Sequence, residues 1–152
     1  MTTSQALPQA LAEIVNDFQE LEERDRLTLL LEFSRSLPAL PERQSNHPEL
    51  LEQVVECQSP LFLTVESEKT DHGDVIRLFF QAPPEAPTTR GFASVLFEGL
   101  DGLTAEEILA VPDDMPEQLG LTRAISPLRM RGMSAMLGRV KRKIRGGVRP
   151  AA

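Results

Sequence analysis

Apolar and polar residues alternate through the middle of the chain, and this alternation limits the possible fold more than any other feature of the sequence. It runs from 61 to 66 and returns from 75 to 81, after a Lys-Thr-Asp-His-Gly turn. Successive side chains of a strand point to opposite faces of a sheet, so the two segments are typical of half-buried strands joined in a hairpin. The apolar run that ends at Val55 can add a third strand.

Helical spacing replaces this alternation on the N-terminal side. Apolar residues recur at three- and four-residue steps over 7–21, which predicts a first helix. The same spacing over 27–37 predicts a second helix, and Asp25 is a residue type that commonly caps a helix N-terminus. Because the break between the two segments is short, we expect the two helices to pack together as scaffold.

The C-terminal side is also helical. A proline-rich segment leads into a predicted helix over 91–99, Thr104 and Glu107 have the spacing of a capping box, and Ser126 with Pro127 is typical of a helix start. The last helix carries an apolar stripe: Met133, Met136, Leu137, Val140 and Ile144. We therefore expect an α+β fold, in which a small antiparallel three-stranded sheet packs against helices and both ends of the chain are helical.

The 152 residues are enough for one domain, expected over 1–145, with a disordered tail over 146–152. The net charge is −7, but residues 1–117 hold all 23 acidic side chains, whereas residues 118–152 hold nine basic ones and no acidic one. A basic end can bind nucleic acid, yet the acidic body would repel the same phosphates, so we expect no nucleic-acid partner.

No apolar run approaches the roughly 20 residues that a membrane span needs, and the polar start of the chain lacks a signal-peptide pattern. We therefore expect no membrane partner and a cytoplasmic protein. One unpaired cysteine agrees with a reducing compartment.

The single cysteine, Cys57, stands among polar residues between the predicted strands. One cysteine cannot close an intrachain disulfide or build a Cys-rich metal site, and two distant histidines, His47 and His72, make a poor zinc site, so we expect no metal. Two interpretations of the thiol stay open: it packs as a small hydrophobe, or it performs one-sulfur chemistry. Its polar neighbours, and Pro60 with no backbone donor, favour a loop tip and the second interpretation.

Four segments of the chain bear a resemblance to one known family. They are Glu-Cys-Gln-Ser-Pro-Leu-Phe-Leu at 56–63, Arg-Gly-Phe-Ala-Ser-Val-Leu-Phe at 90–97, Leu-Thr-Ala-Glu-Glu-Ile-Leu at 103–109 and the segment from Leu121 to Met133. In this order they resemble parts of the SufE-type cysteine desulfuration proteins, the sulfur acceptors of iron–sulfur cluster assembly, and the first resembles the family's active-site segment. The similarity spans roughly residues 8 to 145. Glu56 stands where the family often has glycine, and Phe62 where it often has tryptophan.

The resemblance implies a function and its partners. A SufE-like protein takes persulfide sulfur onto Cys57 from a pyridoxal-phosphate-dependent cysteine desulfurase (SufS-like), stimulates that desulfurase and passes the sulfur to a downstream iron–sulfur scaffold. It would be a sulfur-transfer partner and not an enzyme, as a monomer or a homodimer. It would carry no cofactor, since pyridoxal phosphate would belong to the desulfurase.

Within this function, Cys57 would be the persulfide-forming nucleophile, alternating between a sheltered state and one that reaches the partner. Gln58 and Ser59 would orient its loop through side-chain-to-backbone hydrogen bonds.

Two arginines lie where a helix disfavours a cation. Arg90 precedes one predicted helix and Arg129 falls in the first turn of the last one, at the positive end of each helix dipole. They are either ordinary exposed arginines or groups that meet a partner's carboxylates or lie near the thiol. The resemblance favours Arg129, because the family has an arginine at the matching position.

Two other functions remain open. A stand-alone thiol peroxidase or other redox protein would use Cys57 through a sulfenate, although the chain has no second, resolving cysteine. A non-catalytic adaptor would need no reactive cysteine at all.

Overall fold

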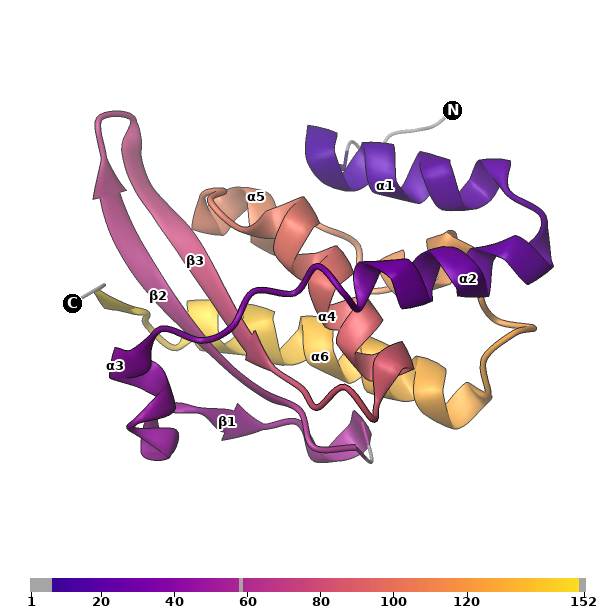
Figure 1. Ribbon diagram of the computed structural model, residues 1–152. Helices are drawn as coiled ribbons and strands as arrows, with labels where there is room; N and C mark the ends of the chain where they lie inside the picture. Colours follow the sequence, from indigo (N-terminus) through magenta and orange to yellow (C-terminus); the bar gives the residue numbers. More distant parts are fainter. Residues whose placement is uncertain (1–6, 58, 151–152) are drawn as a thin grey trace.

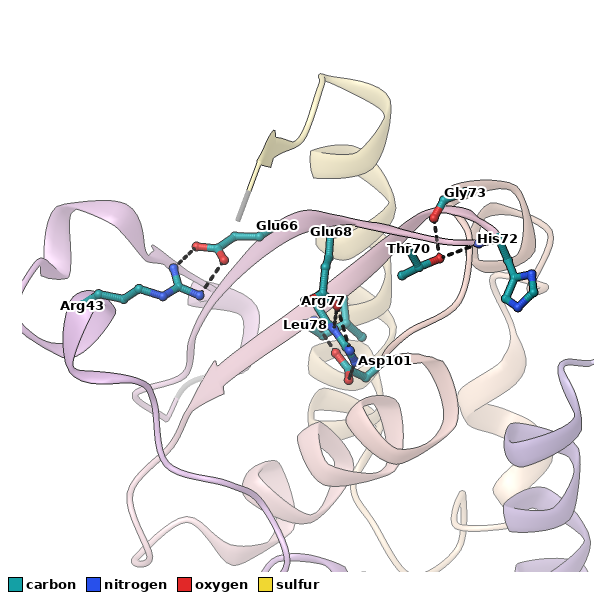
Figure 2. Close-up of polar contacts among 9 residues, drawn as sticks. All are labelled: Arg43, Glu66, Glu68, Thr70, His72, Gly73, Arg77, Leu78 and Asp101. Carbon is teal, nitrogen blue, oxygen red and sulfur yellow. Dashed lines mark hydrogen bonds and ion pairs between the residues drawn. The ribbon is translucent and has the colours of Figure 1, made fainter. Parts of the chain in front are cut away.

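The computed structural model describes residues 7–57 and 59–150. The central element is a hairpin of two long strands, β2 (Phe62–Thr70) and β3 (Gly73–Gln81), which pair antiparallel along their whole length. Two residues join them, and Gly73 adopts a φ of 110°, which a residue with a Cβ rarely adopts. Thr70 closes the turn by donating to the Gly73 carbonyl at 2.7 Å and accepting from the His72 amide at 3.2 Å (Figure 2).

Two short strands complete the sheet on the β2 edge that faces away from β3. β1 (Glu52–Gln53) pairs antiparallel with the start of β2, and β4 (Arg149–Pro150) pairs parallel with its middle. The predicted α+β fold with a three-stranded antiparallel sheet is thus confirmed by β1, β2 and β3, and β4 extends it. The tail differs from the expected disorder as far as Pro150, because backbone groups left open on β2 beyond β1 can pair with it.

Segment 101–103 covers the other edge of the sheet. The Ile76 amide donates to the Leu103 carbonyl at 2.7 Å, the Gly102 amide donates to the Ile76 carbonyl at 2.7 Å, and the Leu78 amide donates to the Asp101 carboxylate at 2.8 Å. Part of the exposed edge of β3 is therefore satisfied by the chain that leaves α4 (Pro87–Leu100).

The longer helices form layers on one face of the sheet (Figure 1). α4 packs on β3, and α6 (Pro127–Arg145) packs on β2, where they cover the apolar side chains of the strands. α1 (Gln9–Glu20) and α2 (Glu23–Phe33) lie against α4. The buried strand side chains of this face are Leu63, Val65, Ile76, Leu78 and Phe80.

Shorter helices connect these layers. α3 (Glu42–Ser45) and a 3₁₀ turn (Pro48–Leu50) lead into β1, η2 (Val55–Cys57) lies between β1 and β2, and α5 (Ala105–Leu109) and η3 (Met115–Leu119) join α4 to α6. None of the helices in the described ranges combines the length and the apolar character of a membrane span.

Ion pairs lie on the face of the sheet opposite the layers of long helices (Figure 2). The buried Glu66 carboxylate accepts two hydrogen bonds from Arg43, at 2.7 and 2.8 Å, which anchors α3. Arg77 lies between Glu68 and Asp101, with one bond of 2.9 Å to each. These bidentate and bridging geometries fix the guanidinium groups in orientation as well as in charge.

The predicted helix signals have mixed outcomes. The capping box of Thr104 and Glu107 is confirmed, and the Ser126 hydroxyl accepts from the Arg129 amide at 3.2 Å, as a cap should. The whole apolar stripe of α6 is buried. The cap at Asp25 is wrong: α2 begins at Glu23, which places Asp25 inside the first turn, where the helix dipole also favours an acid.

Replacing Gly91 with alanine should destabilise the fold. A Cβ at position 91 would overlap the backbone carbonyl of Leu30, so α2 and α4 would have to separate, at a cost of about 1–3 kcal/mol. Gly138 in α6 is the matched control, because a Cβ there meets nothing within 4 Å and alanine should stabilise the helix by about 0.5–1 kcal/mol. Urea unfolding of both variants measures these changes, and equal midpoints would contradict the close α2–α4 contact.

Candidate functional site

Cys57 ends η2, in the connection between β1 and β2. The Val54 amide donates to the Leu61 carbonyl at 2.9 Å and closes this connection into a loop, and the Cys57 amide donates back to the Val54 carbonyl at 3.1 Å. The structure thus places the cysteine between extended segments, as the sequence indicated. The side chain does not project into solvent, however, because only 7% of the residue surface is exposed.

Helix α6 of the same chain buries the thiol, at Gly132. A Cβ at position 132 would lie 3.0 Å from Cys57 Cα, which is tighter than ordinary contacts, and 3.4 Å from Cys57 Sγ. The thiol also points to the Gly132 carbonyl, as a weak donor at 3.5 Å. Glycine at this helix position therefore permits residues 54–57, the cysteine segment, to lie directly on the α6 backbone.

A small cavity of about 10 Å³ borders the thiol. Besides the cysteine, its wall consists of two threonines of α4 and four residues of α6: Thr88, Thr89, Arg129, Gly132, Met133 and Met136. This volume is close to that of a single water-sized probe. The described residues therefore leave a small space next to the sulfur.

Burial raises the pKa of the Cys57 thiol to about 11, and the negative charge of Glu56 adds to this, whereas the positive charge of Arg139 acts in the opposite direction. Near neutral pH only about one molecule in 10⁴ would then hold a thiolate in this closed arrangement. The cysteine is therefore poorly reactive where it lies.

An ion cluster connects the cysteine segment to α6. The Arg139 guanidinium pairs with Glu52 of β1 and, at 2.8 Å, with Glu56 of η2, and Lys143 pairs with Glu52 at 3.1 Å. Burial raises the pKa of Glu52, but the bonds from Arg139 and Lys143 outweigh it and hold that pKa below its ordinary value. The pKa of Glu56 is lowered by a bond from its own backbone amide and then by Arg139.

Sequence reasoning missed Arg139, since its position outside the apolar stripe suggested only a solvent-exposed cation. Two signals point to it in retrospect: the contrast between the acidic body and the basic C-terminal segment, and the carboxylate of Glu56 where the resembling family often has glycine. Neither signal reveals which of the nine basic residues faces the cysteine.

The two arginines singled out from the sequence have different surroundings. Arg129 is exposed and borders the Cys57 cavity, so the structure brings it to the thiol. Arg90 is half-buried and donates to three backbone carbonyls, those of Ser34, Leu37 and Ala82, which tie the end of α2 to the end of β3. It is not part of the cavity wall.

The other residues singled out from the sequence are Gln58, Ser59, His47 and His72. Gln58 lies outside the described residues, and Ser59 is half-buried at a bend. His47 pairs with Glu49 at 3.0 Å, away from the thiol, and His72 is in the hairpin turn. No group of three potential metal ligands occurs within residues 7–57 and 59–150.

The raised pKa predicts the pH dependence of Cys57 alkylation. Because the folded thiol ionises near pH 11, its reaction with iodoacetamide should keep rising about tenfold per pH unit past pH 9, where an ordinary thiol approaches its plateau. Intact-mass measurement of the rate from pH 7 to 11.5 checks this, with the urea-unfolded chain as control. Identical profiles for the folded and unfolded chains would contradict the buried site.

Comparison with known proteins identifies the family of the chain. The family model SufE, described as "Fe-S metabolism associated domain", matches residues 12–144. An uncharacterized SufE-like protein of Mycobacterium tuberculosis is 54% identical over 145 residues, which cover 95% of this chain and 98% of the relative. A SufE-like protein of Arabidopsis thaliana, described as chloroplastic/mitochondrial, is 27% identical over 90% of this chain and 35% of its own length.

A solved structure shares the fold as well. The solution structure of a hypothetical protein from Thermus thermophilus matches with a TM-score of 0.77 and 35% identity, over 93% of this chain and 97% of that one. The family match covers β1, the cysteine loop, the hairpin and nearly all of α6, which are the elements that build the site. The chain therefore belongs to the SufE family, whose domain is associated with iron–sulfur metabolism.

Proposed function

We propose that this protein accepts a sulfur atom on Cys57 from the persulfide of a pyridoxal-phosphate-dependent cysteine desulfurase and passes it to iron–sulfur cluster assembly. The single observation that carries the proposal is the site itself: the only cysteine of a SufE-family chain is buried against α6 and borders a small cavity. Family membership supports the role in iron–sulfur metabolism, and the persulfide on Cys57 is the proposed chemistry.

The transfer is a thiol–persulfide exchange. The Cys57 thiolate attacks the outer sulfur of the desulfurase persulfide, a new S–S bond forms on Cys57, and the old S–S bond breaks. The bonding electrons leave with the inner sulfur, which becomes the desulfurase thiolate. No external oxidant or reductant is needed, and the protein is a sulfur-transfer partner that turns over only when the sulfur moves on.

The closed arrangement suits storage better than attack. A buried thiol with a pKa of about 11 is a poor nucleophile near neutral pH, so the attack requires the cysteine segment to leave α6 and reach the partner. After the transfer, return of the segment would place the persulfide in the cavity, away from reductants. The same raised pKa weighs against a stand-alone thiol peroxidase, which needs an accessible thiolate.

The surface around the cysteine suits a protein partner. Val55 and Leu128 are the two large hydrophobic residues with high exposure in the described ranges, at 62% and 42%. Val55 lies two residues before Cys57, and Leu128 precedes Arg129 at the cavity wall. Exposed apolar side chains beside a cation support docking of a partner that offers an apolar patch with a carboxylate.

Several parts of the proposal lie with the partners. Docking would stimulate the desulfurase by removing its sulfur, pyridoxal phosphate would stay on the desulfurase, and a downstream scaffold would receive the sulfur. This chain would hold no cofactor of its own and would work in the cytoplasm.

Intact mass spectrometry tests the sulfur transfer. Incubation with a cysteine desulfurase and cysteine should add about 32 Da, one sulfur atom, and the adduct should disappear with dithiothreitol and be absent in Cys57→Ser. Adducts of about 16 Da with peroxide turnover would instead establish a redox enzyme. If neither adduct forms while the desulfurase still binds, the adaptor function replaces the proposal.

Replacing Arg129 with glutamate should weaken desulfurase binding and slow sulfur transfer, by on the order of tenfold, because it reverses the charge beside the thiol. Arg145→Glu makes the same charge change about 24 Å away along α6 and is the matched control. Titration calorimetry gives the affinity, and desulfurase turnover gives the rate. Equal losses in both variants would remove Arg129 from the interface.

A further inference from the structure

We propose that Arg139 is a positioning residue that holds the Cys57 segment closed on α6, by bridging a carboxylate at the start of the segment and a second one beside the thiol. Release of this bridge would open the segment. The inference rests on the proposed function in one respect: sulfur transfer requires that opening.

The bridge connects α6 both to the strand before the cysteine segment and to the residue next to the thiol. Glu52 is in β1, before the loop, and Glu56 directly precedes Cys57 in η2, while Arg139 and Lys143 lie one turn apart on α6. Arg139 reaches both carboxylates, and Lys143 adds a second contact to Glu52. A single guanidinium therefore fixes both the approach of the chain to the site and the residue next to the thiol.

Other polar contacts between this segment and α6 are weak. Among the described atoms of residues 54–57, the remaining polar contact with α6 is the thiol to the Gly132 carbonyl, at 3.5 Å. The Val54–Leu61 and Cys57–Val54 bonds are internal to the loop and can move with it. Val55 is mostly exposed, so it adds little packing. Val54 is fully buried in the core, so the packing of Val54 and Cys57 acts together with the ion bridge to keep the segment closed.

The surroundings of Arg139 favour a fixed bridge over a loose surface pair. Its side chain is only 14% exposed, compared with 33% and 40% for Glu52 and Glu56. Its Nε is buried with no hydrogen-bond partner among the described residues, so the guanidinium is held by its carboxylate contacts on the side facing the loop. A partly buried cation of this kind loses more than an exposed one when its carboxylates leave.

Arg139 could act on the thiol in a second way, and the two effects have opposite signs. As a bridge it hides the thiol, so its removal should speed modification of Cys57. As a nearby positive charge it lowers the thiol pKa, so its removal alone should slow modification. The rate of alkylation therefore distinguishes the two roles directly.

The test compares iodoacetamide rates for the whole chain, without a desulfurase, in wild type, Arg139→Gln, Arg139→Lys and Glu52→Gln. Arg139→Gln should react on the order of three- to tenfold faster, and Arg139→Lys should fall between it and wild type, since lysine keeps the charge but cannot bridge with a fork. Glu52→Gln should also react faster, although Glu52 is not among the charges that shift the thiol pKa. Arg145→Gln is the control and should match wild type.

Two further readouts separate opening from general destabilisation. Raising NaCl from 0.05 to 1 M should speed alkylation of wild type more than that of Arg139→Gln, because only the Lys143–Glu52 pair remains for salt to screen in the variant. Glu52→Gln should react faster than wild type at every pH from 7 to 10, because it releases the bridge and keeps the positive charge of Arg139 in the chain. Urea unfolding of each variant shows whether the fold persists, and Glu52→Gln tests the bridge if Arg139→Gln does not fold.

An unchanged rate in Arg139→Gln and Glu52→Gln would overturn the proposal and leave packing alone to hold the segment. A slower rate in Arg139→Gln would overturn it in favour of the charge effect. Neither result depends on sulfur transfer, because no persulfide is involved. A failure of the desulfurase assay would likewise leave the alkylation result standing, so the two proposals can fail independently.

Discussion

The close approach of the cysteine segment to the backbone of α6 is the contact on which the rest of the site depends. Glycine at position 132 favours it, because a Cβ there would lie 3.0 Å from Cys57 Cα and the cysteine segment would have to shift away from the helix. α6 in turn is held by its buried stripe against the sheet and α4, so the helix that completes the core also forms the floor of the thiol cavity. The chemistry of Cys57 is therefore coupled to core packing, and the sulfur is positioned by the same element that stabilises the fold.

Burial has two consequences for a sulfur carrier. It raises the thiol pKa and so suppresses attack by the thiolate. It would also limit the access of reductants and oxidants to the proposed persulfide on Cys57. A site suited only to attack would expose the thiol beside a cation. The observed arrangement instead shelters the thiol, and under the proposed function reactivity would be controlled by movement of the short loop between β1 and β2.

The strong separation of charge along the chain is partly neutralised inside the fold. Basic residues of α6 pair with acidic residues from distant segments: Arg139 with Glu52 and Glu56, and the buried Lys141 with Asp113. Other arginines of the helix, including Arg129, remain exposed. The same helix thus uses its cations for two purposes, to attach its own chain and to present a positive surface beside the cysteine.

The sequence by itself determined the fold class, the hairpin, the capping box and the buried stripe of α6, because each depends on local periodicity or on residues a few positions apart. It also identified Cys57, since a lone cysteine in a polar segment is visible without a structure. It could not place Asp25 correctly within α2, because helix ends are weakly specified by single residues. Only the tertiary structure decided that the thiol is buried, that Arg90 binds backbone carbonyls while Arg129 borders the cavity, and that Arg139 faces Glu56. Most of these outcomes rest on contacts between residues more than 50 positions apart, such as Cys57 with Gly132, Arg90 with Ser34 and Arg139 with Glu56, and a local sequence pattern carries no information on them.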